Sequence, residues 1–370
     1  NKEYYWQVKT WDGEENESEY SDAATFYTGL LDQEDWHPAE WIGRDTLQPK
    51  PRSIAIRRDF NLNKPVKEAR LYVTGLGNYI FFINGNKVGK DWLTPGWTHY
   101  PKKIQYQTYD VTKMLQEGDN ACGVYLGNMW WSSGVGWKGG VAYTDGPLSM
   151  IMKMIISNED GTTTEIVSDG NWQWHTSPIV ENTIYDGETY DARLEMDSWS
   201  QAGFQASGWQ NTDLISIHDT LKLVAQQAPT IQVTEEIMPV KVNEVKPGIH
   251  VFDLGQNMVG VARLKVNAPA GTTITMRFAE LLHPDGTVAQ ENLRSAKVDD
   301  IYITRGTGEE VYEPHFTYHG FRYVQVEGLP ESPDKNTITG LVFHTNAENS
   351  GKFASSNQLL NQIQQNILWG

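Results

Sequence analysis

Apolar and polar residues alternate in short runs along most of this chain of 370 residues. The runs are rich in Val, Ile and aromatic residues and are bounded by Gly, Asn and Asp, which is typical of half-buried β-strands separated by turns. Spacing typical of helices is scarce before the C-terminus. The pattern therefore predicts an all-β chain.

The clearest local signal is a hairpin in the segment LYVTGLGNYIFFINGNKVG, residues 71–89. The segment contains two apolar runs, and the pair Asn84-Gly85 supplies the positive φ values that a tight hairpin turn requires. We therefore predict a turn at this pair.

The other runs predict two consecutive β-sandwich (jelly-roll-like) domains, and the chain is long enough for each to have its own core. The runs GVYLG, LSMIMKMIIS, TTEIVS and NWQWHT join the hairpin in a first sandwich over residues 39–225. The runs HVFDLG, VARLKVNA, TTITMRFAELL, DDIYITRG, FRYVQVEG and ITGLVFHT predict a second sandwich over residues 226–350.

Both ends of the sequence predict pieces of further domains. Residues 1–30 read as two strands around an acidic turn, and they resemble the last two strands of a fibronectin III-like domain. A lone two-stranded hairpin is only marginally stable in water. In residues 351–370, the segment SSN offers N-cap side chains and precedes leucine and isoleucine at helical spacing, which predicts the first helix of an α-helical domain.

Charge and composition narrow the possible partners. The chain has 47 acidic and 30 basic residues, and its net charge of -17 opposes binding to phosphate backbones or anionic lipid. No stretch approaches the roughly 20 apolar residues of a membrane span. We expect neither nucleic acid nor membrane as a partner, and we expect the single cysteine, Cys122, to be a buried thiol. The 14 Trp and 17 Tyr suit carbohydrate recognition without proving it.

The sequence gives little support to a dinucleotide, transition-metal or esterase site. Gly134, Gly136 and Gly139 form a G-x-G-x-x-G, but a dinucleotide site needs this motif to open a helix, whereas here the chain continues into a loop and a strand. The sequence contains no H-E-x-x-H, paired C-x-x-C or G-x-S-x-G, which leaves transition-metal and common esterase sites without support.

A cluster of carboxylates invites a catalytic interpretation. Asp186, Glu188 and Asp191 lie close to Arg193, and neighbouring carboxylates can raise one another's pKa. We favour a structural role for the loop, because the arginine can neutralise and hydrogen-bond the carboxylates.

Aromatic residues in a glycine-rich loop are the candidate sugar-binding residues. Trp130, Trp131 and Trp137 lie among Gly and Ser in NMWWSSGVGWKGGVAYTDGP, where a core would show regular alternation. Aromatic faces beside polar oxygens suit a sugar site, although packing in the core is the alternative. Trp92, beside Asp91, is a further candidate.

Three nearby aromatic residues carry the opposite expectation. Trp97, Tyr106 and Tyr109 lie in the turn and strands that build the first sandwich. We predict that they pack in the core.

Several long motifs resemble the bacterial α-L-rhamnosidases, inverting glycoside hydrolases that remove terminal rhamnose. They occur in the family's order and cover nearly the whole chain. The first motif covers residues 77–131 and begins GNYIFFINGNKVGKDWLTPGWTHY. The others are YDGETYDAR, VFDLGQNMVG, AELLHPDGTVAQENLRSAKVDDIYI, EPHFTYHGFRYVQVEG and FASSNQLLNQIQQNILWG. The last resembles the entry into the family's (α/α)6 catalytic barrel.

The resemblance implies the accessory β-domains of such an enzyme, packed against a catalytic barrel that this chain lacks. The family's acid and base lie in the barrel, so no catalytic residue carries over, and the chain alone is expected to be inactive. Rhamnose-containing carbohydrate is the implied partner, and a periplasmic, cell-surface or secreted location is expected. A free-standing carbohydrate-binding protein and a structural adhesin-like array are the alternatives.

The resemblance also implies a possible metal, although no cofactor is required. Some versions of the first domain resemble a rhamnose-binding module that uses calcium. Asp91 and Asp145 are the hard oxygen donors nearest the matching loops, and calcium needs several such oxygens.

Overall fold

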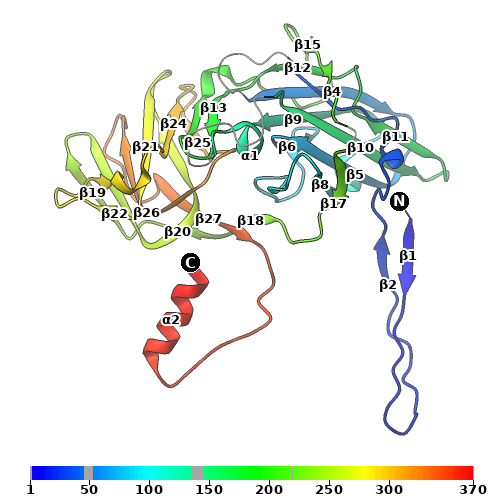
Figure 1. Ribbon diagram of the computed structural model, residues 1–370. Coiled ribbons are helices and arrows are strands. Elements are labelled where there is room, and N and C mark those ends of the chain that lie inside the picture. The colour runs from blue at the N-terminus through cyan, green and yellow to red at the C-terminus, as the bar shows by residue number, and fades with distance from the viewer. Residues whose placement is uncertain (1, 46–52, 136–145, 219, 370) are drawn as a thin grey trace.

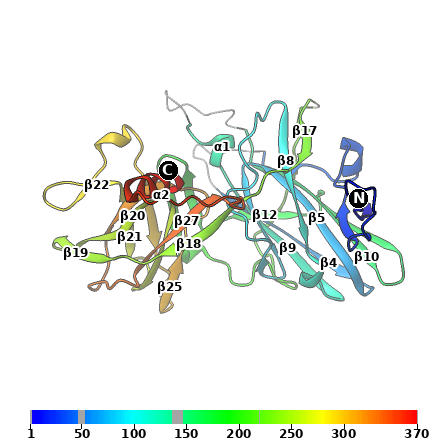
Figure 2. The ribbon, with the colours of Figure 1, turned by 90° about the horizontal axis from the view of Figure 1, so that it is seen from below.

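The computed structural model describes residues 2–45, 53–135, 146–218 and 220–369. Nearly all of its regular structure is β, arranged as two sandwich units that lie side by side (Figure 1, Figure 2). The predicted all-β fold with two consecutive sandwiches is confirmed. Among these residues, no helix is long and apolar enough to cross a membrane.

The first unit packs two sheets face to face, one in the order β16-β3-β10-β5-β8-β17 with β11 on β10, the other β15-β12-β4-β9-β6-β7. The first sheet contains β3 (Ile42–Gly43), β5 (Val66–Leu76), β8 (Lys103–Asp110), β10 (Ser149–Asn158), β11 (Thr163–Val167), β16 (Asp213–Leu214) and β17 (Lys222–Ala225). The second contains β4 (Ile54–Leu62), β6 (Asn78–Ile83), β7 (Asn86–Lys87), β9 (Gly118–Gly127), β12 (Gln173–Thr176) and β15 (Gln210–Asn211).

Apolar side chains from both sheets fill the space between them. Leu71 and Val73 of β5, Phe81 of β6 and Val124 of β9 belong to one buried cluster. Cys122 is buried among them, as predicted, and burial raises the pKa of its thiol. The predicted turn is also present, because Asn84 and Gly85 have φ values of 50° and 82° between β6 and β7.

The second unit is built on one large sheet, in the order β13-β14-β24-β21-β26-β20-β27-β18, with β19 and β25 also pairing with β20. Its strands are β13 (Ile179–Thr183), β14 (Gly187–Asp191), β18 (Ile231–Ile237), β19 (Lys241–Lys246), β20 (Ile249–Asn267), β21 (Thr273–Ala279), β24 (Asp299–Ile303), β25 (Glu309–Tyr312), β26 (His319–Glu327) and β27 (Ile338–Thr345). β22 (Leu281–Leu282) and β23 (Val288–Ala289) form a separate hairpin.

The hairpin β13–β14 crosses between the units. It belongs in sequence to the stretch that supplies the first sandwich, yet β14 pairs in parallel with β24 of the second sheet, with Thr189 opposite Ile301. A single buried apolar cluster also runs through both units and includes Tyr125 of the first and Phe278 of the second. The two sandwiches therefore share a core.

A buried carboxylate fixes this junction. The Glu188 side chain is 0% exposed and accepts hydrogen bonds from the backbone N–H groups of His315 and Phe316, both at 2.9 Å. The Tyr312 hydroxyl donates to it at 3.2 Å, and His315 Nδ1 lies 2.9 Å away. Burial raises the pKa of Tyr312 well above its usual range, so its hydroxyl keeps the proton that it donates.

A second buried pair continues the junction on the backbone side of Glu188. The Glu188 N–H donates to Asp300 Oδ1 at 3.0 Å, and the other oxygen of Asp300 lies 3.0 Å from His319 Nε2. Both side chains of this pair are almost fully buried.

The described residues also form five short helices and one longer helix at the C-terminal end. The short helices are η1 (Gln33–Trp36), η2 (Thr112–Met114), α1 (Met129–Ser132), η3 (Ala192–Leu194) and η4 (Glu291–Leu293), and the longer helix is α2 (Gln358–Trp369). The hairpin of β1 (Glu3–Trp6) and β2 (Ala24–Tyr27) projects from the first unit, and the Arg70 guanidinium lies 3.4 Å from the centre of the Tyr27 ring (Figure 1). Helix α2 exposes Leu359, Leu360, Ile363 and Ile367.

We expect Glu188→Ala to lower the free energy of unfolding by about 3 kcal/mol, because the substitution leaves several buried donors without an acceptor. Urea unfolding measures this change. The matched control is Glu236→Ala, which removes an exposed glutamate paired with Arg263 and should cost less than about 1 kcal/mol. Equal losses in the two variants would contradict the structural importance of Glu188.

Candidate functional site

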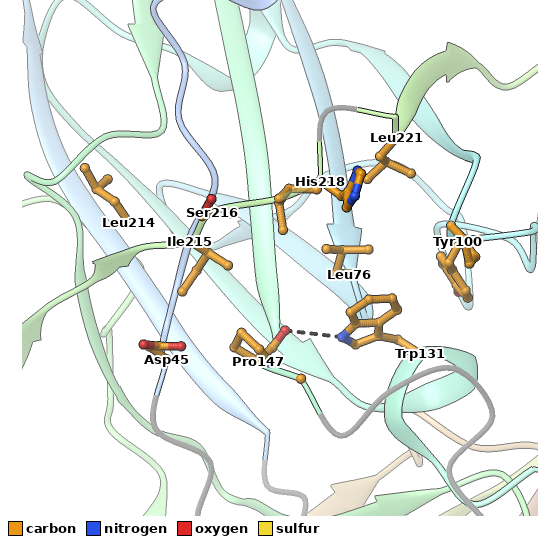
Figure 3. A pocket seen from close by; sticks show the side chains of 13 residues that line it. Asp45, Leu76, Tyr100, Trp131, Pro147, Leu214, Ile215, Ser216, His218 and Leu221 are labelled. Atoms are coloured by element: carbon orange, nitrogen blue, oxygen red, sulfur yellow. Dashed lines mark hydrogen bonds between the residues drawn. The ribbon is translucent and has the colours of Figure 1, made fainter.

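The candidate site is a pocket of about 490 Å³ on the first unit (Figure 3). It lies between the end of β5, the segment after β16 and helix α1. The lining residues are Asp45, Leu76, Tyr100, Pro101, Trp131, Gly146, Pro147, Leu214, Ile215, Ser216, Ile217, His218 and Leu221. This volume lies within the range of small-molecule sites.

Trp131 forms one wall of the pocket and is held in a fixed orientation. Its indole N–H donates to the Pro147 carbonyl oxygen at 3.2 Å (Figure 3). Its ring meets the ring of Tyr100 edge to face, with centroids 5.4 Å apart. The short helix α1 supplies Trp131, so this candidate sugar-binding residue does line a pocket.

The neighbouring Trp130 points elsewhere. It is only 7% exposed and stacks on Trp97, with ring centroids 6.3 Å apart and an interplanar angle of 14°. Trp97 is 54% exposed, so the prediction that it packs in the core is wrong. The physical reason is its position in a loop outside the strands, whereas Tyr106 and Tyr109 lie on β8, where Tyr106 is buried and Tyr109 is partly buried against the core of the first unit.

Asp91 lies at the connection between the two units and is absent from the pocket lining. One carboxylate oxygen accepts hydrogen bonds from the Thr230 hydroxyl at 2.6 Å and from the Gln232 amide at 3.2 Å. The other accepts from the Tyr109 hydroxyl at 2.8 Å. The carboxylate thereby joins β8 of the first unit to the start of β18 in the second.

Trp92 lies at the same connection. Its backbone N–H donates to the Ile231 carbonyl oxygen at 2.8 Å, and its ring packs against Phe343 of β27 with centroids 4.6 Å apart. The Lys87 ammonium lies 4.7 Å from the centre of the ring. The surroundings of Trp92 are therefore those of an interdomain contact.

The expected calcium site stays a prediction. Both oxygens of Asp91 already accept hydrogen bonds, while Asp145 and Trp137 lie outside the described residues. Within the described parts of the chain, no group of three or more His, Cys, Asp or Glu side chains is placed to hold a metal ion.

The carboxylates near Arg193 have separate partners. Asp191 caps the short helix η3 by accepting the backbone N–H of Arg193 at 3.1 Å, and it also accepts the guanidinium at 2.8 and 2.7 Å. Glu188 faces the second unit, and Asp186 accepts the backbone N–H of Lys297. These side chains hold the segment in place and do not face one another across a cleft.

Sequence reasoning missed most of the pocket. Tyr100 carries no signal of its own in the sequence, and the stretch LISIH, residues 214–218, contains no motif. The one available signal was Trp131 in its glycine-rich surroundings. The wall opposite Trp131 lies more than 80 residues further along the chain, so only the folded sheet brings the two together.

Comparison with known families gives three matches in order along the chain. Residues 1–32 match the Rha78A-like N-terminal immunoglobulin domain, residues 64–235 the alpha-L-rhamnosidase N-terminal domain, and residues 243–344 the bacterial alpha-L-rhamnosidase concanavalin-like domain. The first match names an immunoglobulin domain where the sequence suggested a fibronectin III-like one.

Individual relatives agree with these matches. An alpha-L-rhamnosidase of Streptomyces avermitilis is 43% identical over 85% of this chain and 31% of its own length. The solved alpha-L-rhamnosidase of Dictyoglumus thermophilum superposes with a TM-score of 0.92 at 38% identity, over 100% of this chain and 42% of its own. The solved structure of the Streptomyces avermitilis alpha-L-rhamnosidase complexed with L-rhamnose superposes with a TM-score of 0.83 at 41% identity, over 86% of this chain and 31% of its own. The chain thus spans less than half the length of these relatives.

The ion pair of Asp191 predicts a pH-dependent contribution to stability. Hydrogen bonds from Arg193 lower the pKa of Asp191, so the stabilisation is complete above the unfolded value of about 3.9 and is lost as the pH falls through the lower folded value. Asp191→Asn should therefore melt at a lower temperature than the wild type at pH 7, and the gap should narrow below about pH 4. Melting curves between pH 3 and pH 7 test this.

The control for this measurement is Asp22→Asn, which changes an exposed aspartate in the N-terminal hairpin. It should leave the melting temperature unchanged at every pH. A constant gap for Asp191→Asn over the whole range would show that the ion pair does not stabilise the fold.

Proposed function

The chain belongs to the bacterial α-L-rhamnosidase family, and from this premise we propose that it is the β-sandwich portion of a glycoside hydrolase that removes terminal α-L-rhamnose from glycans or glycosides. The observation that carries the proposal is the unbroken order of the three family matches along one chain. We assign the reaction itself to a catalytic domain outside these sandwiches, because the chain covers only 31% and 42% of the length of two such relatives.

The proposed role of the two sandwiches is a rigid support. Their shared core and the hydrogen bonds of Asp91 to Tyr109 and Thr230 hold them in one orientation. Helix α2 carries leucine and isoleucine side chains that contact little within the described residues, and such a face suits packing against a neighbouring helix. We propose that this neighbour belongs to the catalytic barrel.

A second candidate function is carbohydrate binding, either within the enzyme or as a free-standing binding protein. The exposed ring of Trp97 supports it, since flat aromatic faces stack on sugar rings. The buried Trp130 beneath fixes the orientation of that ring. A reading frame continuing into a helical domain would favour the enzyme, whereas a stop after α2 would favour the binding protein.

We expect this polypeptide to release no rhamnose from p-nitrophenyl α-L-rhamnoside. Inverting hydrolysis requires a carboxylic acid and a carboxylate roughly 6.5 to 9.5 Å apart on opposite sides of the sugar. The carboxylates of the 186–191 segment are instead engaged with separate partners. Absorbance of released nitrophenol is the measurement, and turnover that Asp191→Asn abolishes and Asp22→Asn preserves would overturn this placement of the active site.

If the carbohydrate role is correct, methyl α-L-rhamnoside should bind in the millimolar range, worth about 4 kcal/mol. Trp97→Ala should weaken this binding, while Trp6→Ala, which removes a comparably exposed ring from the N-terminal hairpin, should not. Titration calorimetry with calcium and then with EDTA separates the two modes. Binding lost in EDTA indicates a metal-bridged sugar, and binding kept indicates stacking alone. Absence of heat in both buffers would reject the carbohydrate role.

A further inference from the structure

The pocket beside Trp131 has a lining that suits an apolar ligand. Of its thirteen lining residues, all within the described part of the chain, nine are aliphatic, aromatic or proline. Besides the Tyr100 hydroxyl and the Trp131 indole N–H, the polar side chains are those of Asp45, Ser216 and His218, which belong to residues exposed to solvent. Apolar side chains therefore make up most of the lining, and Asp45, Ser216 and His218 add polar groups from exposed residues (Figure 3).

A whole sugar ring is a poor match for this interior. Each hydroxyl group of a pyranose that enters the pocket loses its hydrogen bonds to water and needs a partner there, and an unpartnered hydroxyl is costly to bury. The five leucine and isoleucine side chains of the lining offer no such partner. A flat apolar group, in contrast, gains from contact with the same walls and with the ring of Trp131.

The walls are built before any ligand arrives. Leu76 and Tyr100 are almost fully buried and belong to the apolar core, and Trp131 is tied to the Pro147 carbonyl. Leu214, at the edge of the pocket, is 59% exposed although the backbone around it is fixed by the pairing of β16 with β3. A large aliphatic side chain held at the edge of an apolar pocket gains burial when the pocket is occupied.

We propose that this pocket takes the apolar aglycone of an α-L-rhamnoside, with the sugar lying outside it near the exposed Asp45, Ser216 and His218. The sugar in this statement rests on the proposed function, whereas the apolar occupant follows from the lining alone. Trp97 is absent from the lining, so a sugar stacked on that ring uses a different part of the surface.

The test compares an aryl rhamnoside with a methyl rhamnoside by titration calorimetry on the intact chain. p-Nitrophenyl α-L-rhamnoside should bind at least fivefold more tightly than methyl α-L-rhamnoside. Leu214→Asp should abolish this preference, because it places a charge at the edge of the apolar pocket. The matched control is Leu281→Asp, which changes a leucine that is 70% exposed in the second unit and should keep the preference.

A second variant guards against a folding defect. Ser216→Trp adds a bulky ring to the lining without adding charge, and it should also abolish the preference while the melting temperature stays near that of the wild type. Equal binding of the aryl and methyl rhamnosides would overturn the proposal. Absence of binding by the aryl rhamnoside, or a preference that survives in both pocket variants, would overturn it as well.

A last comparison separates this proposal from the proposed function. If p-nitrophenyl β-D-glucoside shows the same gain over methyl β-D-glucoside, and Leu214→Asp removes it, the apolar pocket stands and the assignment of rhamnose to it fails. If the aryl compound binds more tightly than the methyl compound only among the rhamnosides, both the apolar pocket and the assignment of rhamnose to it are supported.

Discussion

The burial of the Glu188 carboxylate is the constraint that fixes the β13–β14 hairpin on the second sheet, and this hairpin connects the two units. A carboxylate without access to water is stable only where fixed donors replace that water. Here the donors come from Tyr312, His315 and Phe316, which belong to one short segment of the second unit. Because two of the donors are backbone N–H groups, the position of the chain itself is fixed, and not only that of its side chains. Close packing of Phe316 against Gly127, where a side chain would collide with the ring, follows from this docking.

A second attachment lies at the Asp91 carboxylate, which binds Thr230 and Gln232 of the connecting segment. One contact between two bodies permits rotation about it, whereas two separate contacts restrict that rotation. The apolar cluster between them excludes water from the shared interface. The pocket lies on the first unit and takes its walls from this rigid body, so its shape is set by the core and not by a ligand.

The fold class could be predicted because its signals are local. The alternation of apolar and polar residues predicts the strands, the pair Asn84-Gly85 predicts a turn, and the spacing of leucine and isoleucine predicts α2. The pairing of Thr189 with Ile301 and the meeting of Tyr100, Trp131 and Leu214 had no such signal, because each joins segments far apart in the sequence. The burial of Trp97 and Trp130, whose rings stack on each other, could not be predicted from the sequence either. Both are tryptophans near glycine, and only their stacking decides which ring is buried and which is exposed.

The crossing of the hairpin β13–β14 also affects how the two sandwiches can be exchanged between genes during evolution. The chain leaves the first sandwich to supply two strands of the second sheet, and it then returns before the second sandwich is made. No single cut separates the units without leaving that hairpin unpaired or the second sheet without its terminal strands. Exchange of one sandwich between genes by recombination would therefore yield an incomplete sheet with an open edge. The two sandwiches are expected to move through evolution as one indivisible module.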